Sequence, residues 1–230
     1  MLTLADVIEA LQGNRPQGIT PGITEAVVDS RHAIPGSLFV ATVGERTDGH
    51  LYVADAFKNG AHLALVENEI DPTIPVVDLT KPLDLQFTFP QLPFALRVEN
   101  TVQALQTIAS YWRGRFNVRV IGITGSVGKS TTKELVAEIL SQRFRTLKNQ
   151  GNLNNEIGLP LTLLRLGPGY QNLAADMKGQ FLKWVFMSPV ISIYYAVSRN
   201  RRLASSPTLV RFTLQEQNHR KQSQGVKVNW

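Results

Sequence analysis

Apolar residues recur at two different spacings along most of this chain. Four segments carry them three or four positions apart, the spacing that places side chains on one face of a helix. These predicted helices are residues 3–11, 51–59, 101–115 and 129–142. Short apolar runs rich in Val, Ile and Leu predict strands at residues 26–29, 37–41, 63–66, 75–77, 95–98, 118–124 and 145–147. Strands that alternate with helices in this way predict an α/β fold.

Polar residues and glycines indicate where these elements begin and end. Thr3 and Asp6 have the spacing of a helix-capping pair, and Asn100 can cap the helix that starts at the next residue. Pro35 and Gly36 are expected to form the turn between the first two strands.

The predicted elements divide into two domains. Residues 1–99 are expected to form a small α/β domain, and the helix at 101–115 links it to the second domain. Residues 100–171 then hold a strand, a loop, a helix and a second strand. That order predicts the start of a parallel sheet with a ligand site at the carboxyl ends of its strands.

The loop before the helix at 129–142 predicts a nucleoside triphosphate site. Its glycines would allow backbone N–H groups to close around phosphate oxygens. Lys129 would reach the terminal phosphates, and the Ser130 hydroxyl would ligate Mg²⁺. The nucleotide-binding residues are expected to be Thr124, Gly125, Ser126, Val127, Gly128, Lys129 and Ser130. The glycine spacing is one residue longer than usual, so a glycine-rich turn without a ligand is the alternative.

Amide side chains gather just after the strand predicted at 145–147. Amides donate and accept hydrogen bonds without carrying charge, which suits a site for a polyanionic sugar nucleotide. The candidates are Asn152, Asn154 and Asn155. The alternative, which composition alone favours, is an Asn-rich loop that caps a helix starting near Pro160.

Two further polar segments lie in the first domain, at residues 29–31 and 47–50. Each segment alone is typical of a surface turn. His50 stands beside Asp48 and is a candidate base, although a lone loop histidine is more often structural. No His, Asp and Glu cluster has the spacing of a metal site, and no Ser, His and Asp arrangement stands out.

Taken together, these motifs resemble the Mur ligases over about residues 1–171. Residues 29–31, 35–41 and 48–50 are similar to the N-terminal domain of the later Mur enzymes, and residues 124–130 match the family's nucleotide loop. Residues 151–164 are similar to the branch that adds D-alanyl-D-alanine. The branch that adds the third amino acid is an alternative, which the Asn-Leu-Asn-Asn run disfavours.

The resemblance implies an ATP-dependent ligase of peptidoglycan synthesis that uses ATP and Mg²⁺. A substrate carboxylate would take the γ-phosphoryl group, and the amine of D-alanyl-D-alanine would displace phosphate from the acyl phosphate. Lys129 and Ser130 would stabilise the transferring group. The resemblance implies that one group of residues lies near the UDP part of UDP-N-acetylmuramoyl-peptide: Ser30, Arg31, Asp48, Gly49 and His50. It implies that a second group lies near the transferred phosphate: Asn152, Asn154 and Asn155.

Beyond residue 171 the chain departs from the family pattern. The family's next strand ends in Glu-Met-Gly, whose Glu helps to hold Mg²⁺, and we expect no such acidic partner here. A reading-frame shift between about Tyr170 and Gln180 accounts for the change. Residues 172–230 are then an aberrant, poorly ordered tail, the P-loop ATPase domain is incomplete, and the chain is an inactive fragment. The alternative is a non-catalytic nucleotide- or UDP-binding protein whose tail associates with membranes through residues 181–197.

Charge and composition change this picture little. The net charge is +6, yet residues 1–172 hold 15 Lys and Arg against 16 Asp and Glu, so the excess lies in the tail. Its scattered charges lack interleaved aromatic residues and do not predict binding to nucleic acid. The apolar run contains Lys183 and Pro189 and is short for a membrane span, so we expect no membrane association. With no cysteine and no secretory signal, a cytoplasmic monomer is expected.

Overall fold

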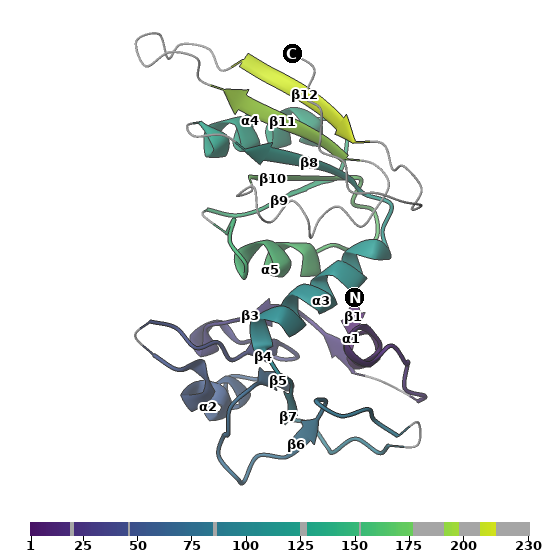
Figure 1. The fold of residues 1–230 in the computed structure, drawn as a ribbon, viewed down its shortest axis with the longest axis vertical. Coiled ribbons are helices and arrows are strands. Elements are labelled where there is room, and N and C mark those ends of the chain that lie inside the picture. Colours follow the sequence, from purple (N-terminus) through teal and green to yellow (C-terminus); the bar gives the residue numbers. More distant parts are fainter. Residues whose placement is uncertain are drawn as a thin grey trace, which may run out of the picture.

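Figure 1 shows a computed structural model in which one helix joins two halves. The structure describes residues 1–18, 21–45, 47–84, 87–124, 128–151 and 153–176, and the strands at 191–197 and 208–214. In this part of the chain the helices are α1 (Leu4–Gln12), α2 (Val53–Lys58), α3 (Thr101–Gly114), α4 (Lys129–Ser141) and α5 (Gly158–Leu164), with two 3₁₀ turns, η1 (Ser30–His32) and η2 (Gly49–Tyr52). Each half has a sheet packed with helices, so the predicted α/β class is confirmed.

The sheet of the N-terminal half has the strand order β3-β4-β5-β7-β6, and all neighbouring strands are parallel. Its strands are β3 (Ala26–Val27), β4 (Leu38–Val40), β5 (Leu63–Val66), β6 (Val76–Asp78) and β7 (Phe94–Arg97). A separate antiparallel pair joins β1 (Leu2–Thr3) to β2 (Gly22–Ile23).

Side chains on the two faces of this sheet enter two apolar clusters. Leu38 and Val40 of β4 pack in a cluster that also contains residues of α1 and α3. Phe39, which lies between them, packs instead with residues of α2. Successive strand residues point to opposite faces, so one run of apolar residues serves both clusters. The sheet is therefore the middle layer between helices.

Local hydrogen bonds fix the start of α1. The Thr3 hydroxyl accepts from the Asp6 main-chain N–H at 3.2 Å, while Asp6 Oδ2 accepts from the Thr3 N–H at 2.9 Å, which confirms the predicted capping pair. Asp6 Oδ1 also accepts from Arg15 at 2.8 Å and from Arg115 at 3.3 Å. Burial raises the pKa of the Asp6 carboxyl, but the hydrogen bonds from Thr3 and Arg15 outweigh it and leave that pKa below its usual value.

Helix α3 joins the two halves and is held along its length. Asn100 is its N-cap, as predicted, and its Oδ1 accepts from a first-turn N–H at 2.8 Å. Glu67 Oε2 accepts from the Thr101 N–H at 2.6 Å. Near the other end, Trp112 Nε1 donates to the Leu166 carbonyl at 2.9 Å. The helix thus contacts α1 and the first sheet as well as α5.

The second sheet has the strand order β12-β11-β8-β10-β9. Its strands are β8 (Arg119–Thr124), β9 (Thr146–Lys148), β10 (Asn172–Asp176), β11 (Ile191–Val197) and β12 (Thr208–Leu214). Strand β10 lies between β8 and β9 and is parallel to both. Strand β11 is parallel to β8, and β12 is antiparallel to β11. The carboxyl ends of β8, β9 and β10 therefore meet at one edge.

Several elements differ from the sequence-based predictions. Strands β3 and β4 are parallel, so the chain passes through η1 before the Pro35-Gly36 turn, because parallel strands need a crossover. The helix predicted at 51–59 begins as the 3₁₀ turn η2 and becomes α-helical at Val53. Strand β10 was not predicted, and it carries the second sheet on to Asp176.

The segments weighed as a tail are only partly described. Of the apolar run at 181–197, residues 181–190 lie outside the described residues, and 191–197 form β11. Among the residues that the structure describes, helices long and apolar enough to cross a membrane are absent.

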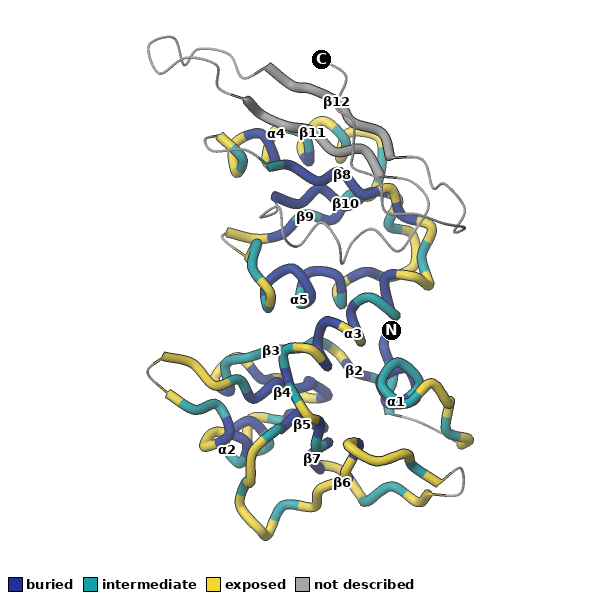
Figure 2. Tube along the Cα trace, in the orientation of Figure 1, coloured by how far each residue is buried: buried dark blue, intermediate teal, exposed yellow. Residues whose placement is uncertain are grey.

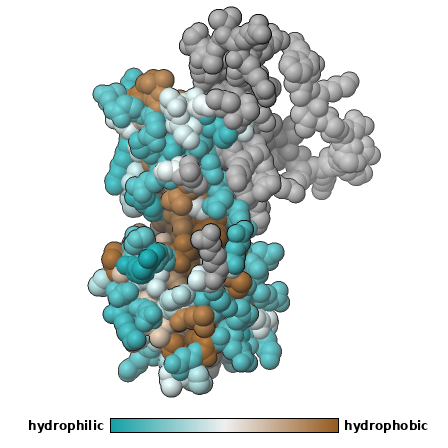
Figure 3. All heavy atoms as spheres, turned by 90° about the vertical axis from the view of Figure 1, so that its left-hand side faces the viewer, coloured by the Kyte–Doolittle hydropathy of each residue, from teal (hydrophilic) through white to brown (hydrophobic). Residues whose placement is uncertain are grey.

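Burial follows this architecture. In Figure 2 most of β4, β5, β7, β8 and β10 is buried. One apolar cluster includes residues of α1, α3, α5 and β10, and so extends through both halves. Figure 3 shows that apolar surface also gathers at the junction between the halves on the face drawn there.

Candidate nucleotide and substrate sites

The predicted phosphate loop connects β8 to α4 at the carboxyl edge of the second sheet. Thr124 ends β8, and Lys129 is the first residue of α4. Gly128 precedes the helix with a φ of 80°, a left-handed conformation that favours glycine. Residues 125–127, which include Gly125, Ser126 and Val127, lie outside the described residues. The loop thus leads to a helix N-terminus, whose free N–H groups and dipole favour anions.

A carboxylate lies directly beside this helix start. The Ser130 hydroxyl of α4 donates to Oδ2 of Asp176, the last residue of β10, at 3.2 Å. Asp176 is fully buried. The sequence analysis expected no acidic partner for Mg²⁺ after this loop, whereas the structure places one carboxylate, that of Asp176, beside Ser130. Asp176 stands at the carboxyl end of the strand next to β8, where parallel strands bring ligand-binding groups together.

Asn149 holds the same carboxylate from the end of β9. Its Nδ2 donates to Asp176 Oδ1 at 2.5 Å and to the Leu153 carbonyl at 3.1 Å. Its Oδ1 accepts from the Asp176 N–H at 3.2 Å. Asn149 is fully buried, so these bonds satisfy an amide that water does not reach. It lies two residues after the strand predicted at 145–147, and this position near a strand end could have identified it from the sequence.

Lys133, one turn along α4, completes this group. Its side chain is 1% exposed, and its Nζ donates to the Asn149 carbonyl at 2.8 Å. The same ammonium lies 3.2 Å from Glu134 Oε1 and 3.9 Å from Asp176 Oδ1. From the sequence, Lys133 was predicted only as part of the helix at 129–142, because the spacing of apolar residues did not indicate that it would be buried.

The three predicted amides do not share one role. Asn154 Nδ2 is 3.4 Å from Asp176 Oδ2 and so faces the phosphate-loop edge. Asn155 Oδ1 accepts from the Gly158 N–H at 2.8 Å at the start of α5, which is the capping role weighed as the alternative. Asn152 lies outside the described residues. A Cβ at Gly158 would stand 2.5 Å from the Leu153 Cα, so only glycine allows this loop to lie against α5.

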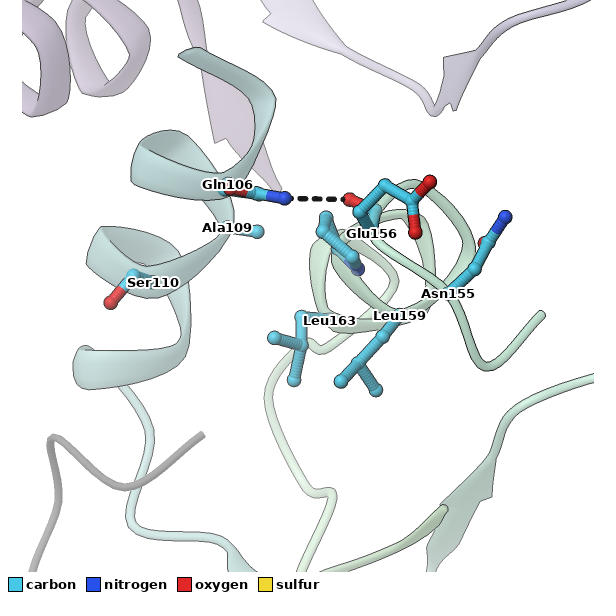
Figure 4. Close-up of a pocket in the computed structure, with 8 residues that line it drawn as sticks. Gln106, Ala109, Ser110, Asn155, Glu156, Leu159 and Leu163 are labelled. Atoms are coloured by element: carbon cyan, nitrogen blue, oxygen red, sulfur yellow. Dashed lines mark hydrogen bonds between the residues drawn. The ribbon is translucent and has the colours of Figure 1, made fainter. Parts of the chain in front are cut away.

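Figure 4 shows how α3 supports this loop. The Gln106 side chain donates to the Glu156 carbonyl at 3.0 Å. Ala109 of α3 faces Leu159 and Leu163 of α5 across a hollow of about 10 Å³, which Ser110 also lines. A hollow of this size is too small for a substrate, and it lies where α3 packs against α5.

A larger pocket, of about 720 Å³, lies in the N-terminal half. It brings together the two polar segments that the sequence singled out, because residues of both 29–31 and 47–49 line it. Its polar lining residues include Asp29, Ser30, Arg31, Thr47, Tyr52, Asp55, Lys58 and Asn59. Gly49 lines it as well.

Hydrogen bonds organise the wall of this pocket. Arg31 is paired with Asp29, with Nη2 and Oδ2 2.6 Å apart, and its hydrogen bonds hold the pKa of the Asp29 carboxyl well below its usual range. Asn59 Nδ2 donates to the Ser30 carbonyl at 2.9 Å, which ties α2 to η1. Arg31 remains largely exposed, and its guanidinium is available to an anion in the pocket.

His50 and Asp48 are not among the residues that line this pocket. His50 is buried, its Nδ1 contacts Asp48 Oδ1, and its Nε2 accepts from the N–H groups of Glu67 and Asn68 at 2.9 and 3.2 Å. An Nε2 that accepts two hydrogen bonds has no proton, so Nδ1–H donates to Asp48. Both ring nitrogens are engaged, which favours a structural role for His50 over that of a base.

Comparisons with known proteins agree with this geometry. Residues 123–180 match the family described as the Mur ligase middle domain. The chain is similar to the UDP-N-acetylmuramoyl-tripeptide–D-alanyl-D-alanine ligases of Synechocystis, 41% identical over 155 residues, and of Escherichia coli, 38% identical over 183 residues. These matches cover 67% and 78% of this chain but 31% and 36% of the relatives. The chain therefore spans about a third of the length of the curated relatives that it matches.

Solved structures give the same result. A crystal structure of MurF from Acinetobacter baumannii is similar with a TM-score of 0.57 and 34% identity, covering 75% of this chain and 34% of that one. The MurF ligase from Thermotoga maritima, solved in complex with ADP, has a TM-score of 0.53 and 32% identity, covering 66% of this chain and 31% of that one.

Proposed function

The chain belongs to the Mur ligase family over the residues that match it, and from this premise we propose that it carries the nucleotide and UDP-substrate sites of a D-alanyl-D-alanine-adding ligase. The observation that carries the proposal is the meeting of Ser130 and Asp176 at the carboxyl edge of the second sheet. This pair stands at the start of α4, beside the loop that the family match includes. The reaction is the ATP-dependent joining of UDP-N-acetylmuramoyl-tripeptide to D-alanyl-D-alanine.

The nucleotide site is proposed to bind ATP through the phosphate loop. Main-chain N–H groups at the start of α4 and the Lys129 ammonium would hold the phosphate oxygens. The similar Thermotoga protein was solved in complex with ADP, which supports nucleotide binding by this chain. Ser126 and the other central residues of the loop keep their predicted role as ligands of the phosphates.

The side chains at this edge fit Mg²⁺. Ser130 Oγ and Asp176 Oδ2 are oxygen ligands 3.2 Å apart, and Mg²⁺ usually takes one or two protein oxygens and completes its shell with phosphate and water. Among the described residues, groups of three or more His, Cys, Asp or Glu side chains that could hold a metal ion are absent. When bound, Mg²⁺ would neutralise charge on the phosphate oxygens.

In a ligase of this branch the reaction would proceed through an acyl phosphate. A carboxylate oxygen of the tripeptide attacks the γ-phosphorus and ADP leaves. The D-alanyl-D-alanine amine then attacks the acyl carbon and phosphate leaves. Lys129 would stabilise the charge on the transferring phosphoryl group, and loop N–H groups would keep it in line with the attacking oxygen. Asn154 faces this edge and is proposed to orient the substrate there.

The pocket lined by residues 29–31 and 47–49 is proposed to bind the UDP part of the substrate. Arg31 and Lys58 supply positive charge at its wall, and Ser30 and Asn59 supply hydrogen-bonding groups. A diphosphate is an anion that such a wall suits. His50 would contribute indirectly, because it fixes the segment on which Gly49 lies.

Binding of ADP with Mg²⁺ tests the nucleotide site. We expect calorimetry to show saturable binding of ADP to the full chain that depends on Mg²⁺. Asp176→Asn should lower the Mg²⁺-dependent gain in ADP affinity by about tenfold. Asp71→Asn is the matched control, since Asp71 is an exposed carboxylate that bonds to Thr73. A chain that does not bind ADP, or an Asp176→Asn variant that binds as tightly as the unchanged chain, contradicts the proposal.

Binding of UDP tests the second site. Arg31→Gln should lower the affinity for UDP by about tenfold, the effect of losing one charge-assisted contact of roughly 1.4 kcal/mol. Lys81→Gln is the control, because Lys81 is an exposed cation that does not line this pocket. Equal losses in the two variants would mean that UDP responds only to net charge.

Whether this chain completes the reaction is a separate question. It spans about a third of the length of its relatives, and the sequence-based expectation of an inactive fragment stays a prediction. With ATP, UDP-N-acetylmuramoyl-tripeptide and D-alanyl-D-alanine, we expect phosphate release no faster than without the tripeptide. Tripeptide-dependent turnover of about 1 s⁻¹ or more, an ordinary enzyme rate, would refute that expectation.

A further inference from the structure

Lys133 is a buried cation next to the candidate nucleotide site. Its side chain is 1% exposed, although lysine is among the residues least often buried. Moving an ammonium group out of water costs several kcal/mol unless opposite charge and hydrogen bonds compensate. Here the compensation comes from the Asn149 carbonyl at 2.8 Å, the Glu134 carboxylate at 3.2 Å and the Asp176 carboxylate at 3.9 Å.

The two oxygens of Asp176 face different partners. Oδ1 accepts from Asn149 Nδ2 and is the oxygen nearest to Lys133. Oδ2 faces the Ser130 hydroxyl at 3.2 Å and the Asn154 amide at 3.4 Å. The carboxylate therefore has an inner oxygen held by buried groups and an outer oxygen at the phosphate-loop edge.

Ser130 and Lys133 reach this carboxylate from the same face of one helix. They are three positions apart on α4, a spacing that brings side chains together on a helix surface. Lys133 also bonds to the main chain of Asn149, the residue that holds the inner oxygen. One ammonium group thus fixes both the carboxylate and the amide that orients it.

We propose that Lys133 is a positioning residue, which holds the inner oxygen of Asp176 so that the outer oxygen is presented with Ser130 to the metal–nucleotide complex. The inference rests on the proposed nucleotide site. Lys133 touches neither nucleotide nor metal in this proposal. It acts through Asp176 and Asn149, as groups behind a metal ligand commonly do.

Lys148 offers a matched comparison. It is the second lysine paired with Glu134, with which it forms a hydrogen bond, and it lies on β9 with its side chain 43% exposed. Lys148→Met removes a positive charge that is paired with Glu134, but it removes no contact to Asp176. Any effect of net charge on nucleotide binding should therefore appear in both the Lys133→Met and Lys148→Met variants.

The experiment measures ADP binding to the full chain across a range of Mg²⁺ concentrations. Lys133→Met should raise the Mg²⁺ concentration for half-maximal binding by about tenfold or more, the usual cost of losing a group behind a metal ligand, and leave metal-free ADP affinity within about twofold. Lys148→Met should leave both quantities unchanged. Lys133→Gln, which can still donate to the Asn149 carbonyl, should show the same Mg²⁺ defect if Lys133→Met does not fold.

A double-variant cycle distinguishes positioning from general support of the fold. In the Asp176→Asn background, Lys133→Met should have no further effect on the Mg²⁺ requirement, because its route of action is already removed. Additive losses, or an unchanged Mg²⁺ requirement in folded Lys133→Met and Lys133→Gln, overturn the inference while the nucleotide site stands. If the unchanged chain binds no ADP, the proposed function fails, and this inference fails with it.

Discussion

Replacing His50 with phenylalanine tests whether the hydrogen bonds of this histidine hold the segment that borders the proposed UDP pocket. Phenylalanine keeps a ring of similar size, so the change mainly removes polar contacts. It leaves the N–H groups of Glu67 and Asn68 without the Nε2 acceptor, and Asp48 without the ring N–H. Glu67 is only partly exposed, whereas Asn68 and Asp48 lie nearer to water.

The expected cost comes from those contacts. A polar group left unsatisfied away from water costs about 1–3 kcal/mol, and lost bonds at groups that water can reach cost about 0.5–1.5 kcal/mol each. Because water can replace part of what is lost, we expect His50→Phe to lower the free energy of unfolding by about 2–3 kcal/mol. His50→Gln supplies an amide oxygen as acceptor and should cost less.

Urea unfolding followed by circular dichroism measures the difference. With a urea dependence of about 2–3 kcal/mol/M, His50→Phe should lower the midpoint by about 1 M. His32→Gln, at an exposed histidine in η1, should leave it unchanged. UDP affinity should fall in His50→Phe as well, because residues 47 and 49 line the pocket on either side of Asp48. A midpoint within error of the unchanged chain would refute the structural role of His50.

Three further changes test other contacts. The pKa of the Asp6 carboxyl is lower in the folded chain than in the unfolded chain, so the ionised carboxylate stabilises the fold at pH values above the ordinary aspartate pKa of about 3.9. This stabilisation is lost as the pH falls through the pKa of the folded state. Asp6→Asn should thus cost about 1 kcal/mol at pH 7, in urea titrations, and progressively less as the pH falls below the ordinary aspartate pKa. Gly158→Ala should cost about 1–3 kcal/mol through its clash with Leu153, whereas a methyl at Gly167 meets nothing within 4 Å. Trp112→Phe loses a buried hydrogen bond worth about 1–2 kcal/mol and should lower the melting temperature by about 2–8 °C in calorimetry, and an unchanged value would contradict the role of that bond.

Elements with local signals were predictable from the sequence. The capping pair of Thr3 and Asp6 and the N-cap at Asn100 both formed as predicted, because each depends on residues within one helical turn. Strand β5 was predicted at its observed bounds, since a short apolar run between turn residues is distinctive. In such places the local preference and the final fold agree.

Elements fixed by distant contacts were not predictable in the same way. Strand β10 reads Asn-Leu-Ala-Ala-Asp, whose small residues have a weak strand preference, and it forms because β8 and β9 pair with both of its edges. Missing that strand meant missing Asp176. The burial of Lys133 depends on the same pairing, because its partners come from β9 and β10.

The segments that form the candidate substrate pocket were predictable from the sequence, but the role of each side chain in them was not. Residues 29–31 and 47–50 were singled out as polar segments, and both border the pocket. The sequence could not show that His50 would not line it, because its Nε2 accepts hydrogen bonds from the main chain of residues 67 and 68. The polar segments in the sequence therefore located the pocket, but the path of the backbone in three dimensions determines which of their side chains line it.

Helix α3 makes the two halves thermodynamically dependent on each other. Leu105 and Ile108 share one apolar cluster with Val7 of the first half and Leu163 and Leu173 of the second. A cut at residue 99 would separate residues that share this cluster, so each half would expose apolar surface that is now buried. A ligand that binds one half stabilises the folded state in proportion to its occupancy, and here that state includes both halves. UDP bound in the first half would thereby protect the phosphate-loop edge of the second against unfolding.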